Sequence, residues 1–288
     1  MFGQVRLYDY RCFFREYPAT LHVSKGFTSF IGPNNAGKSA LLRSLYELRS
    51  AFRQLQVIAH NPLAVVTNPF ALELVPPLSD RMEVVSDRND PRCAIELLVE
   101  SSATNDLTLV RARLDFSAEG EVLRWQLFGS DDEQLIPGEG RGKVSGAING
   151  AILLHDGRQV QTQAMSSLLD ALIRVQYVGA FRNAINEGSG AHFDVQVGTG
   201  FIAQWHTWKA GASKAQNRAI QQVTEDVRRL VGARTLEVTA SVELKTLQVI
   251  VNGRPYKLSE LGSGISQLIV VLGNALISRP SFIAIDEP

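Results

Sequence analysis

The sequence predicts an α/β protein that has a mixed sheet, an antiparallel β lobe and a mainly helical insertion. Three observations predict this class. A glycine-rich loop at 32–39 lies between an apolar segment and an amphipathic segment. Three segments between 94 and 128 alternate apolar and polar residues, and a short apolar run at 281–285 ends in two acids. Continuous apolar runs are typical of buried parallel strands, whereas alternating runs joined by turns are typical of antiparallel ones.

The residues around the loop have the periodicity of a strand and then of a helix. The upstream stretch ATLHVSKGFTSFI alternates and then becomes continuously apolar, with a turn at Gly26, which predicts two strands, the second buried. The downstream stretch SALLRSLYELRSAF places Leu41, Leu42, Leu45 and Leu48 on one helical face. The loop therefore connects a predicted strand to the first turn of a helix.

The loop itself, GPNNAGKS, matches the pattern G-x-x-x-x-G-K-[ST], in which backbone N–H groups surround phosphates at a helix N-terminus. Lys38 would reach the β- and γ-phosphates of ATP, and the Ser39 hydroxyl would ligate Mg²⁺. The alternative is a glycine-rich turn that matches by accident. The predicted ATP-binding residues are Gly32, Pro33, Asn34, Asn35, Ala36, Gly37, Lys38, Ser39 and Ala40.

The C-terminal segment supplies two acids that suit the same chemistry. Ser281 to Ile285 form a short apolar run, which predicts a buried strand whose carboxyl end carries Asp286 and Glu287. Ligands of a parallel α/β sheet bind at that edge. Asp286 would hold Mg²⁺, usually through water, and Glu287 would act as general base on the attacking water. The alternative is a surface pair that opens a turn before Pro288.

A second glycine-rich stretch, LSELGSGISQ, precedes these acids. Gly262, Ser263 and Gly264 open an amphipathic helix predicted over Ile265 to Ser278. A glycine-serine loop at a helix N-terminus is a second anion site. The alternative is a helix cap with flexible glycines.

The order of these three motifs resembles the head of an ABC-type ATPase, and within that superfamily the RecF, SMC and OLD-like branch of AAA family ATPases. The resemblance implies a P-loop NTPase fold and a head-to-tail homodimer that buries ATP between two heads. It also implies that the second glycine-rich stretch is the ABC signature. Ser263, Gly264 and Gln267 would act in trans, whereas Lys38, Ser39, Asp286 and Glu287 would act in cis, with Lys38 and Glu287 catalytic.

The middle of the chain predicts a β lobe and then helices. The segments AIELLVE, LTLVRARLDF and VLRWQLFG read as an antiparallel meander, and DDEQLIPGEGRGK as an exposed loop. The stretch MSSLLDALIRVQYVGAFRN predicts a helix and a strand that ends near Arg182, and EGSGAHFDVQVGTG predicts a mobile loop. Gln204 to Val231 predict a helical region with a break at Gly211.

Two basic features in this region have open interpretations. The element around Arg182 resembles one in OLD-like ATPases, where the arginine would contact phosphate or nucleic acid; otherwise Arg182 caps the strand or pairs with an acid. The helical region carries Lys209, Lys214, Arg218, Arg228 and Arg229 among acids, as a solvated helix face or a DNA contact would.

The predicted domains are discontinuous in sequence. Residues 1–60 and 235–288 would form the nucleotide-binding core, 61–160 the antiparallel β lobe with its loops, and 161–234 the mixed or helical insertion. The sequence ends at Pro288, immediately after the acidic pair, so the expected core lacks its C-terminal part. We therefore expect a fragment, a truncated product or a polypeptide that obtains its missing half elsewhere.

Composition bears on the partners and the cellular compartment of the protein. Among 288 residues the 29 basic side chains balance the 29 acidic ones, so the net charge gives no evidence for or against a polyanionic partner. Cys12 and Cys93 have no paired spacing, the five histidines show no ligand spacing, and the N-terminus lacks the order of a secretory signal. The longest apolar run, 268–277, is shorter than the roughly 20 residues that span a bilayer. We expect a cytoplasmic protein without membrane insertion.

Taken together, the sequence predicts an ATPase head that dimerises around Mg-ATP and drives a DNA-directed process such as repair, recombination or antiviral defence. Its expected partners are DNA or a nuclease or effector protein, an expectation that follows from the resemblance alone. Two alternatives remain. One is the ATPase subunit of a membrane transporter, and the other is a module that binds ATP to hold a complex together without hydrolysing it.

Overall fold

The structure is a computed structural model that describes residues 3–60, 81–86, 92–100, 107–136, 142–148, 150–180, 189–243 and 245–286. It divides into two compact units, Met1–Arg174 and Val175–Pro288, and each unit is described by itself. Both units combine helices and strands, and the predicted α/β class is confirmed in that sense. The nucleotide-binding core predicted from residues 1–60 and 235–288 remains a prediction. Its first segment lies in the first unit and its second segment in the second unit.

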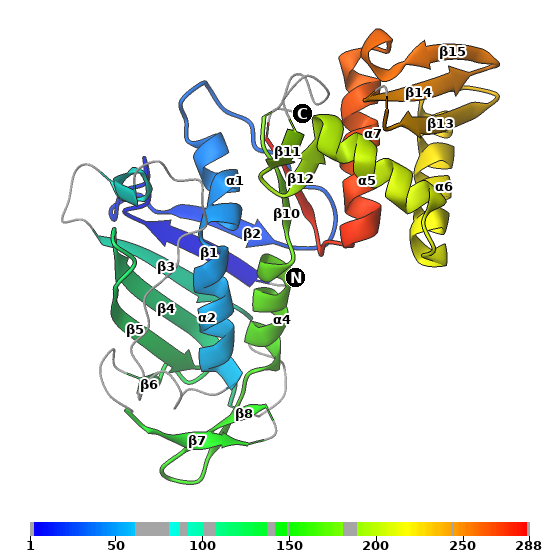
Figure 1. The fold of residues 1–288 in the computed structure, drawn as a ribbon. Coiled ribbons are helices and arrows are strands. Elements are labelled where there is room, and N and C mark those ends of the chain that lie inside the picture. The colour runs from blue at the N-terminus through cyan, green and yellow to red at the C-terminus, as the bar shows by residue number, and fades with distance from the viewer. Residues whose placement is uncertain are drawn as a thin grey trace. The chain divides into compact units, whose positions relative to one another are not determined.

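The first unit is built on a six-stranded antiparallel sheet (Figure 1). The predicted meander forms the third, fourth and fifth strands in spatial order, and the two N-terminal strands extend one side of the same sheet. In spatial order the strands are β2 Ala19–Val23, β1 Gly3–Tyr8, β3 Arg92–Leu98, β4 Leu109–Ser117, β5 Val122–Gly129 and β6 Gln134–Ile136.

Because successive side chains of a strand point to opposite faces, apolar side chains gather on one face of this sheet. Val5, Leu7, Ile95 and Leu114 are fully buried or nearly so. Two helices, α2 Arg49–His60 and α4 Gln163–Ile173, lie side by side against the sheet (Figure 1). The burial of branched side chains between strands and helices is the main stabilising term of such a layer.

The alternate residues of the same strands form a polar face. Register places Arg6 opposite Glu96 and Glu96 opposite Arg113. The Tyr8 hydroxyl donates to Glu96 Oε2 at 2.9 Å, and Arg113 makes a salt bridge of 3.0 Å to Asp115. Cross-strand pairs of opposite charge stabilise an antiparallel sheet, and here they enclose Glu96, which is buried. The period of two in the sequence therefore corresponds to one apolar and one polar face.

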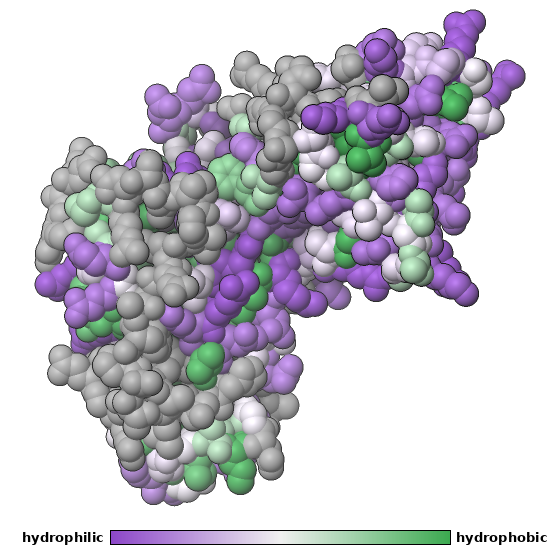
Figure 2. Space-filling view, viewed as in Figure 1, coloured by the Kyte–Doolittle hydropathy of each residue, from purple (hydrophilic) through white to green (hydrophobic). Residues whose placement is uncertain are grey.

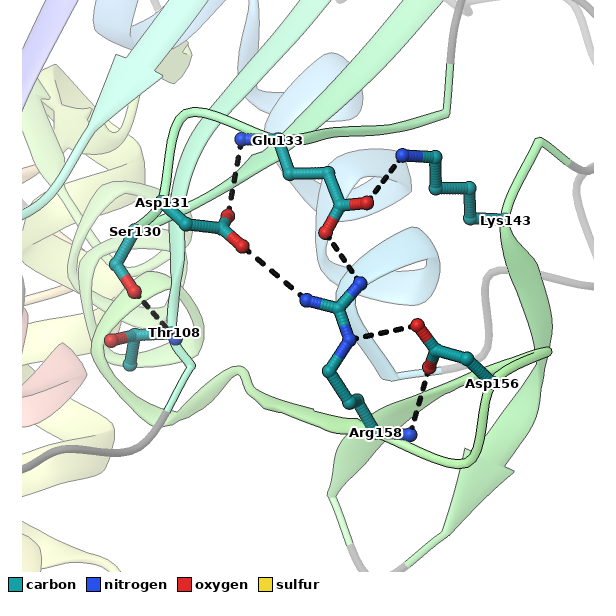
Figure 3. A network of polar contacts seen from close by, with 7 residues as sticks. All are labelled: Thr108, Ser130, Asp131, Glu133, Lys143, Asp156 and Arg158. Carbon is teal, nitrogen blue, oxygen red and sulfur yellow. Dashed lines mark hydrogen bonds and ion pairs between the residues drawn. The ribbon is translucent and has the colours of Figure 1, made fainter.

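A small three-stranded sheet completes the first unit: β7 Val144–Ile148, β8 Ala151–Leu154 and β9 Gln159–Gln161. A polar network ties it to the turn before β6 (Figure 3). Arg158 donates to Glu133 Oε2 at 2.6 Å and to Asp156 Oδ2 at 2.8 Å, and Lys143 also pairs with Glu133. The carboxylates of Glu133, Asp156 and Asp131 thus surround one guanidinium group, which joins the turn before β6 to the turn between β8 and β9.

The second unit has its core between three helices and a three-stranded antiparallel sheet. Trp205, Phe201, Val223, Val249 and Ile269 are among its buried residues. The helices are α5 Gly198–Ala210, α6 Lys214–Leu230 and α7 Ser263–Ser278, and the strands are β13 Leu236–Ser241, β14 Thr246–Val251 and β15 Arg254–Lys257.

Two further strand pairs in this unit position the residues discussed below. The strand β10 Gln176–Val178 pairs in parallel with β16 Ile283–Ile285. The strands β11 Ser189–His192 and β12 Val195–Val197 form a hairpin. Short 3₁₀ turns occur at η1 Arg81–Val84 in the first unit and at η2 Leu258–Glu260 before α7.

Several predicted elements are confirmed by the structure. The helix after the loop is present as α1 Lys38–Glu47, followed by α2. The helical region breaks at Gly211 between α5 and α6, as predicted, and the Ser213 hydroxyl caps α6 by accepting from the Gln216 N–H at 3.4 Å. Each of these segments has a strong local signal, since its apolar spacing or its breaker residue is sufficient to specify it.

One predicted strand is absent, and a second is present but is not buried as predicted. The segment Phe27–Ile31 forms no strand within the described residues; Phe27 is 93% exposed and Ile31 95%. A strand requires a partner for its backbone, and no described strand pairs with this segment. The strand β16 is present, but only Ala284 is buried, because β16 pairs on one edge with β10 alone among the described strands.

Two predicted loops contain strands instead. Part of the loop expected at 131–143 is β6, whose Leu135 and Ile136 are buried. The glycine-rich stretch expected to be mobile forms the β11–β12 hairpin and the first residues of α5. In both cases tertiary packing provides hydrogen-bond partners and burial that turn residues alone do not reveal.

Candidate nucleotide-binding site

The loop predicted to bind phosphate contains two residues in the left-handed backbone region. Asn35 and Gly37 have φ angles of 63° and 85°, in the left-handed region. Gly37 is the N-cap of α1, so the chain turns directly from the loop into the first turn of the helix at Lys38. A left-handed residue at a loop–helix junction turns successive N–H groups toward the same side, which is the geometry of an anion-binding nest.

The Lys38 side chain folds back over this loop. Its Nζ donates to the carbonyl oxygen of Gly32 at 2.9 Å and to that of Pro33 at 2.7 Å. An ammonium group has three donors, so these two contacts leave one for a further acceptor. Lys38 therefore lies across the loop and is held there by two of the loop's own carbonyl oxygens.

The first turn of α1 adds backbone donors to the same place. The Leu41 N–H is bonded to the Gly37 carbonyl at 2.8 Å, which begins the helical pattern, and the first turn contains no acidic residue. The N–H groups ahead of Leu41 have no partner within the helix, and they carry the positive end of its dipole. Ser39 is exposed beside them. A phosphate group fits this set of donors, and the Ser39 hydroxyl offers the oxygen ligand that Mg²⁺ prefers.

The turn after β1 packs closely under the loop. A Cβ atom on Gly37 would lie 2.8 Å from Cys12 Sγ and 2.8 Å from Phe13 Cζ. Two separate reasons therefore favour glycine at position 37: the left-handed φ angle of this residue, and the lack of space for a Cβ atom. The loop therefore packs against this turn and continues directly into α1.

A buried carboxylate joins this turn to α1. Glu47, at the end of α1, is 1% exposed; it accepts from the Tyr10 hydroxyl at 2.6 Å and pairs with Arg11 at 2.6 Å. Arg43, one helical turn earlier, lies 2.6 Å from the same carboxylate. A buried carboxylate that loses one of these partners would leave an uncompensated charge, so the cluster holds the turn and the helix in one arrangement.

The pKa values in this cluster shift in the directions that its contacts predict. Burial, reinforced by the negative charge of Glu47, raises the pKa of Tyr10 well above its ordinary value. Burial opposes the charge of Arg11, but Tyr10 and Glu47 outweigh it, and the pKa of Arg11 is raised. Tyr10 therefore stays neutral, and its hydroxyl donates a hydrogen bond to the Glu47 carboxylate.

The acidic motif lies in the second unit, at the carboxyl end of β16. The Asp286 N–H donates to the carbonyl oxygen of Val178 at 2.9 Å, so the parallel pairing with β10 continues to this residue. The Asp286 carboxylate accepts a hydrogen bond from the Tyr177 hydroxyl at 3.3 Å. Glu287, the predicted general base, lies outside the described residues, as does Arg182.

The signature residues lie at the N-terminus of α7 in the same unit. Gly262 is the N-cap, and Ser263 and Gly264 form the exposed first positions of the helix. Gln267 is half-buried in the next turn. Beneath them, the Ser266 hydroxyl donates to the Leu258 carbonyl oxygen at 2.9 Å and ties α7 to η2. The helix therefore presents its N-terminal donors and the Ser263 hydroxyl to the surface, as an anion site acting on a second molecule would require.

The structure brings together the residues within each motif. Loop, lysine and helix N-terminus form one constellation in the first unit, whereas Asp286 and the signature residues belong to the second. Within the described residues, no group of three or more His, Cys, Asp or Glu side chains comes together as a metal site. Magnesium bound with a nucleotide typically takes one or two protein ligands and completes its shell with phosphates and water.

The residues that contact Asp286 and its strand carry only a weak signal in the sequence. Tyr177 lies in a predicted strand near Arg182 and belongs, with Gly179 and Arg182, to the element whose resemblance drew attention to Arg182, but nothing in the spacing predicts its contact with Asp286. Phe193 and Asp194 fall in the stretch predicted to be a mobile loop. The alternation of His192 to Val197 is a signal that favours a short strand pair, although the surrounding glycines obscure it.

The basic residues of the helical insertion have mixed surroundings. Glu225 pairs with Arg228 at 2.7 Å and with Arg229 at 3.0 Å, which supports a solvated helix face at that end of α6. Lys214 and Arg218 are exposed near its start. The surface seen over α5, α6 and β13–β15 is largely hydrophilic (Figure 2).

Comparison with known proteins does not identify a family for this chain. No protein-family model matches the chain, and no curated protein matches it either. Among the described helices, none has both the length and the apolar character needed to cross a membrane.

Proposed function

We propose that this protein binds Mg-ATP through the loop at 32–39 and acts as an ABC-type ATPase head. The observation that carries the proposal is the position of Lys38, which lies across a loop with left-handed Asn35 and Gly37 at the N-terminus of α1. A glycine-rich turn that matched by accident would not need its lysine folded over the loop.

The contacts of Lys38 suggest how a phosphate would be bound. Two neutral carbonyl oxygens, those of Gly32 and Pro33, now accept from its ammonium group. Charge-assisted hydrogen bonds to phosphate oxygens are roughly twice as strong as bonds between neutral groups. We expect the ammonium group to turn from the carbonyls toward the phosphates, while the N–H groups of the first turn of α1 donate to the same oxygens.

Hydrolysis would require the residues of the second unit as well. Asp286 would hold the Mg²⁺ shell, Glu287 would orient and deprotonate the attacking water, and Lys38 would stabilise charge on the γ-phosphate. The exposed N-terminus of α7, with Ser263, suits a role in trans on the nucleotide of a partner head. We therefore infer a homodimer that forms head to tail on ATP.

The nature of the driven process rests on family resemblance. A DNA-directed role in repair, recombination or defence is the first choice, with DNA or a nuclease or effector protein as partner. The exposed positive charges of Lys214 and Arg218 on α6 suit a phosphate backbone. A non-hydrolysing ATP-dependent module stays the second candidate, because the contacts of Lys38 with the loop support ATP binding and do not by themselves require hydrolysis.

The decisive experiment combines nucleotide binding with turnover. Binding of a fluorescent ATP analogue with Mg²⁺ is compared for the wild type, Lys38→Ala and the control Lys25→Ala, which removes an exposed lysine from the same stretch. We expect loss of binding in Lys38→Ala alone. Equal binding by all three proteins would refute a phosphate-binding role for the loop.

Turnover then distinguishes an ATPase from a binding module. The ATPase rate per protomer is measured as protein concentration is raised. A specific rate that rises with concentration supports a site completed by a second head. Binding without turnover at any concentration supports the non-hydrolysing module.

A further inference from the structure

The Asp286 carboxylate has a partner that the proposed chemistry does not itself require. Tyr177, in β10, is 2% exposed, and its hydroxyl donates to Asp286 Oδ2 at 3.3 Å. We infer that Tyr177 is a positioning residue, which orients the Asp286 carboxylate toward Mg²⁺. This inference rests on the proposed function, since it assigns a role within the same Mg-ATP site.

The strand pairing places the two residues on one face. Tyr177 lies opposite Ala284 in the parallel register, and Asp286 follows two residues later on the same side of β16. The Asp286 backbone is fixed separately, by the hydrogen bond from its N–H to the Val178 carbonyl. With the backbone fixed by β10, the tyrosine hydroxyl restricts the remaining freedom, which is rotation of the carboxylate.

The β11–β12 hairpin holds Tyr177 from the other side. The Tyr177 N–H donates to Asp194 Oδ2 at 2.8 Å, and the Tyr177 ring meets the Phe193 ring edge to face, with centroids 4.9 Å apart. Gly179, just beyond β10, makes room for the Phe193 ring, because a Cβ atom on Gly179 would lie 2.4 Å from Phe193 Cε2. The ring of Tyr177 is therefore clamped, and its hydroxyl has little freedom to leave Asp286.

The hairpin is in turn anchored to the signature helix. Asn274 of α7 accepts from the Gln196 N–H at 3.0 Å and donates to the Gln196 carbonyl at 3.3 Å. Asn274 is 6% exposed, so both bonds are protected from water. A continuous set of packed contacts thus runs from α7 through the hairpin to Tyr177 and Asp286.

Outer contacts of this kind control how well a carboxylate serves a metal. A carboxylate has two oxygens with several lone pairs, so Asp286 can accept from the tyrosine and still bind Mg²⁺ or its water. Loss of such a partner typically reduces metal affinity about 10- to 100-fold. The oxygen–oxygen distance of 3.3 Å is long for a hydroxyl donor, so the lower end of this range, about tenfold, applies to Tyr177.

The test compares ATP affinity with Mg²⁺ and with EDTA for the full chain. In Tyr177→Phe, which keeps the ring, we expect the enhancement by Mg²⁺ to fall about tenfold while the affinity in EDTA stays at the wild-type value. The matched control is Tyr8→Phe, which removes another tyrosine–carboxylate hydrogen bond, to Glu96 on the polar face of the first sheet. Both affinities should be unchanged in this control.

A double variant separates positioning from general damage. Asp286→Asn reduces the Mg²⁺ enhancement, and adding Tyr177→Phe should reduce it no further, because Tyr177 acts through Asp286. Additive losses, an unchanged enhancement in Tyr177→Phe, or a loss that is equal with Mg²⁺ and EDTA would each overturn the inference. If the wild type binds no ATP at all, the proposed function fails and this inference with it.

Discussion

Gly37 allows two physical requirements of the loop to be measured separately. Its φ angle of 85° disfavours any side chain, and a Cβ atom would lie 2.8 Å from both Cys12 Sγ and Phe13 Cζ. Gly157, in a turn of the same unit, has nearly the same φ of 87°, but a Cβ atom there meets nothing within 4 Å. The pair Gly37→Ala and Gly157→Ala therefore differs in crowding at almost constant backbone strain.

The expected magnitudes follow from these two terms. A left-handed conformation disfavours an L-residue by roughly 1–2 kcal/mol, which is the whole effect predicted for Gly157→Ala. Forcing an extra methyl into occupied space costs about 1–3 kcal/mol more, because Cys12 and Phe13 must shift. Gly37→Ala should therefore lower the free energy of unfolding by roughly 2–5 kcal/mol.

Equilibrium urea unfolding of the two variants and the wild type checks this difference. We expect both variants to unfold at lower urea, with the larger shift in Gly37→Ala, and similar slopes for all three proteins. Equal shifts would refute the crowding by Cys12 and Phe13. Loss of ATP binding in Gly37→Ala without any loss of stability would instead place the whole effect on phosphate contacts.

Three further predictions follow from other contacts. Because the pKa of Tyr10 is raised in the folded state, stability should fall as pH rises through 10.0, and Tyr10→Phe should flatten this fall in unfolding titrations between pH 8 and about 11. Ser213→Ala should destabilise α6 by about 0.5–1 kcal/mol, since the cap to Gln216 is long; thermal unfolding unchanged from wild type would contradict the cap. The double reversal Lys214→Glu and Arg218→Glu should weaken duplex DNA binding and flatten its salt dependence in anisotropy titrations, whereas unchanged binding would exclude DNA contact there.

The sequence predicted elements with strong local signals. The helix after the loop, the meander at 94–128 and the break at Gly211 all follow from apolar spacing or from breaker residues. The loop motif could also be recognised, because two glycines, a lysine and a serine at this fixed spacing seldom occur together by chance. The structure adds that Lys38 lies across that loop.

Predictions that depended on distant partners were the ones that did not hold. Phe27–Ile31 has the composition of a buried strand, yet no described strand pairs with it, and composition cannot supply a partner. The β11–β12 hairpin reads as a glycine-rich loop, because its stability comes from Asn274 on α7, which lies 78 residues from Gln196 in sequence.

The sequence by itself therefore determined the motifs, the positions of the helices and the class of fold, since these depend on neighbours a few residues apart. Tertiary structure decided what surrounds the site. The burial of Glu47 with Tyr10 and Arg11, and the contact of Tyr177 with Asp286 across 109 residues of sequence, exist only because the folded chain brings distant side chains together. Hydrogen bonds between such residues leave no periodic trace in a sequence, so they appear only when the fold is known.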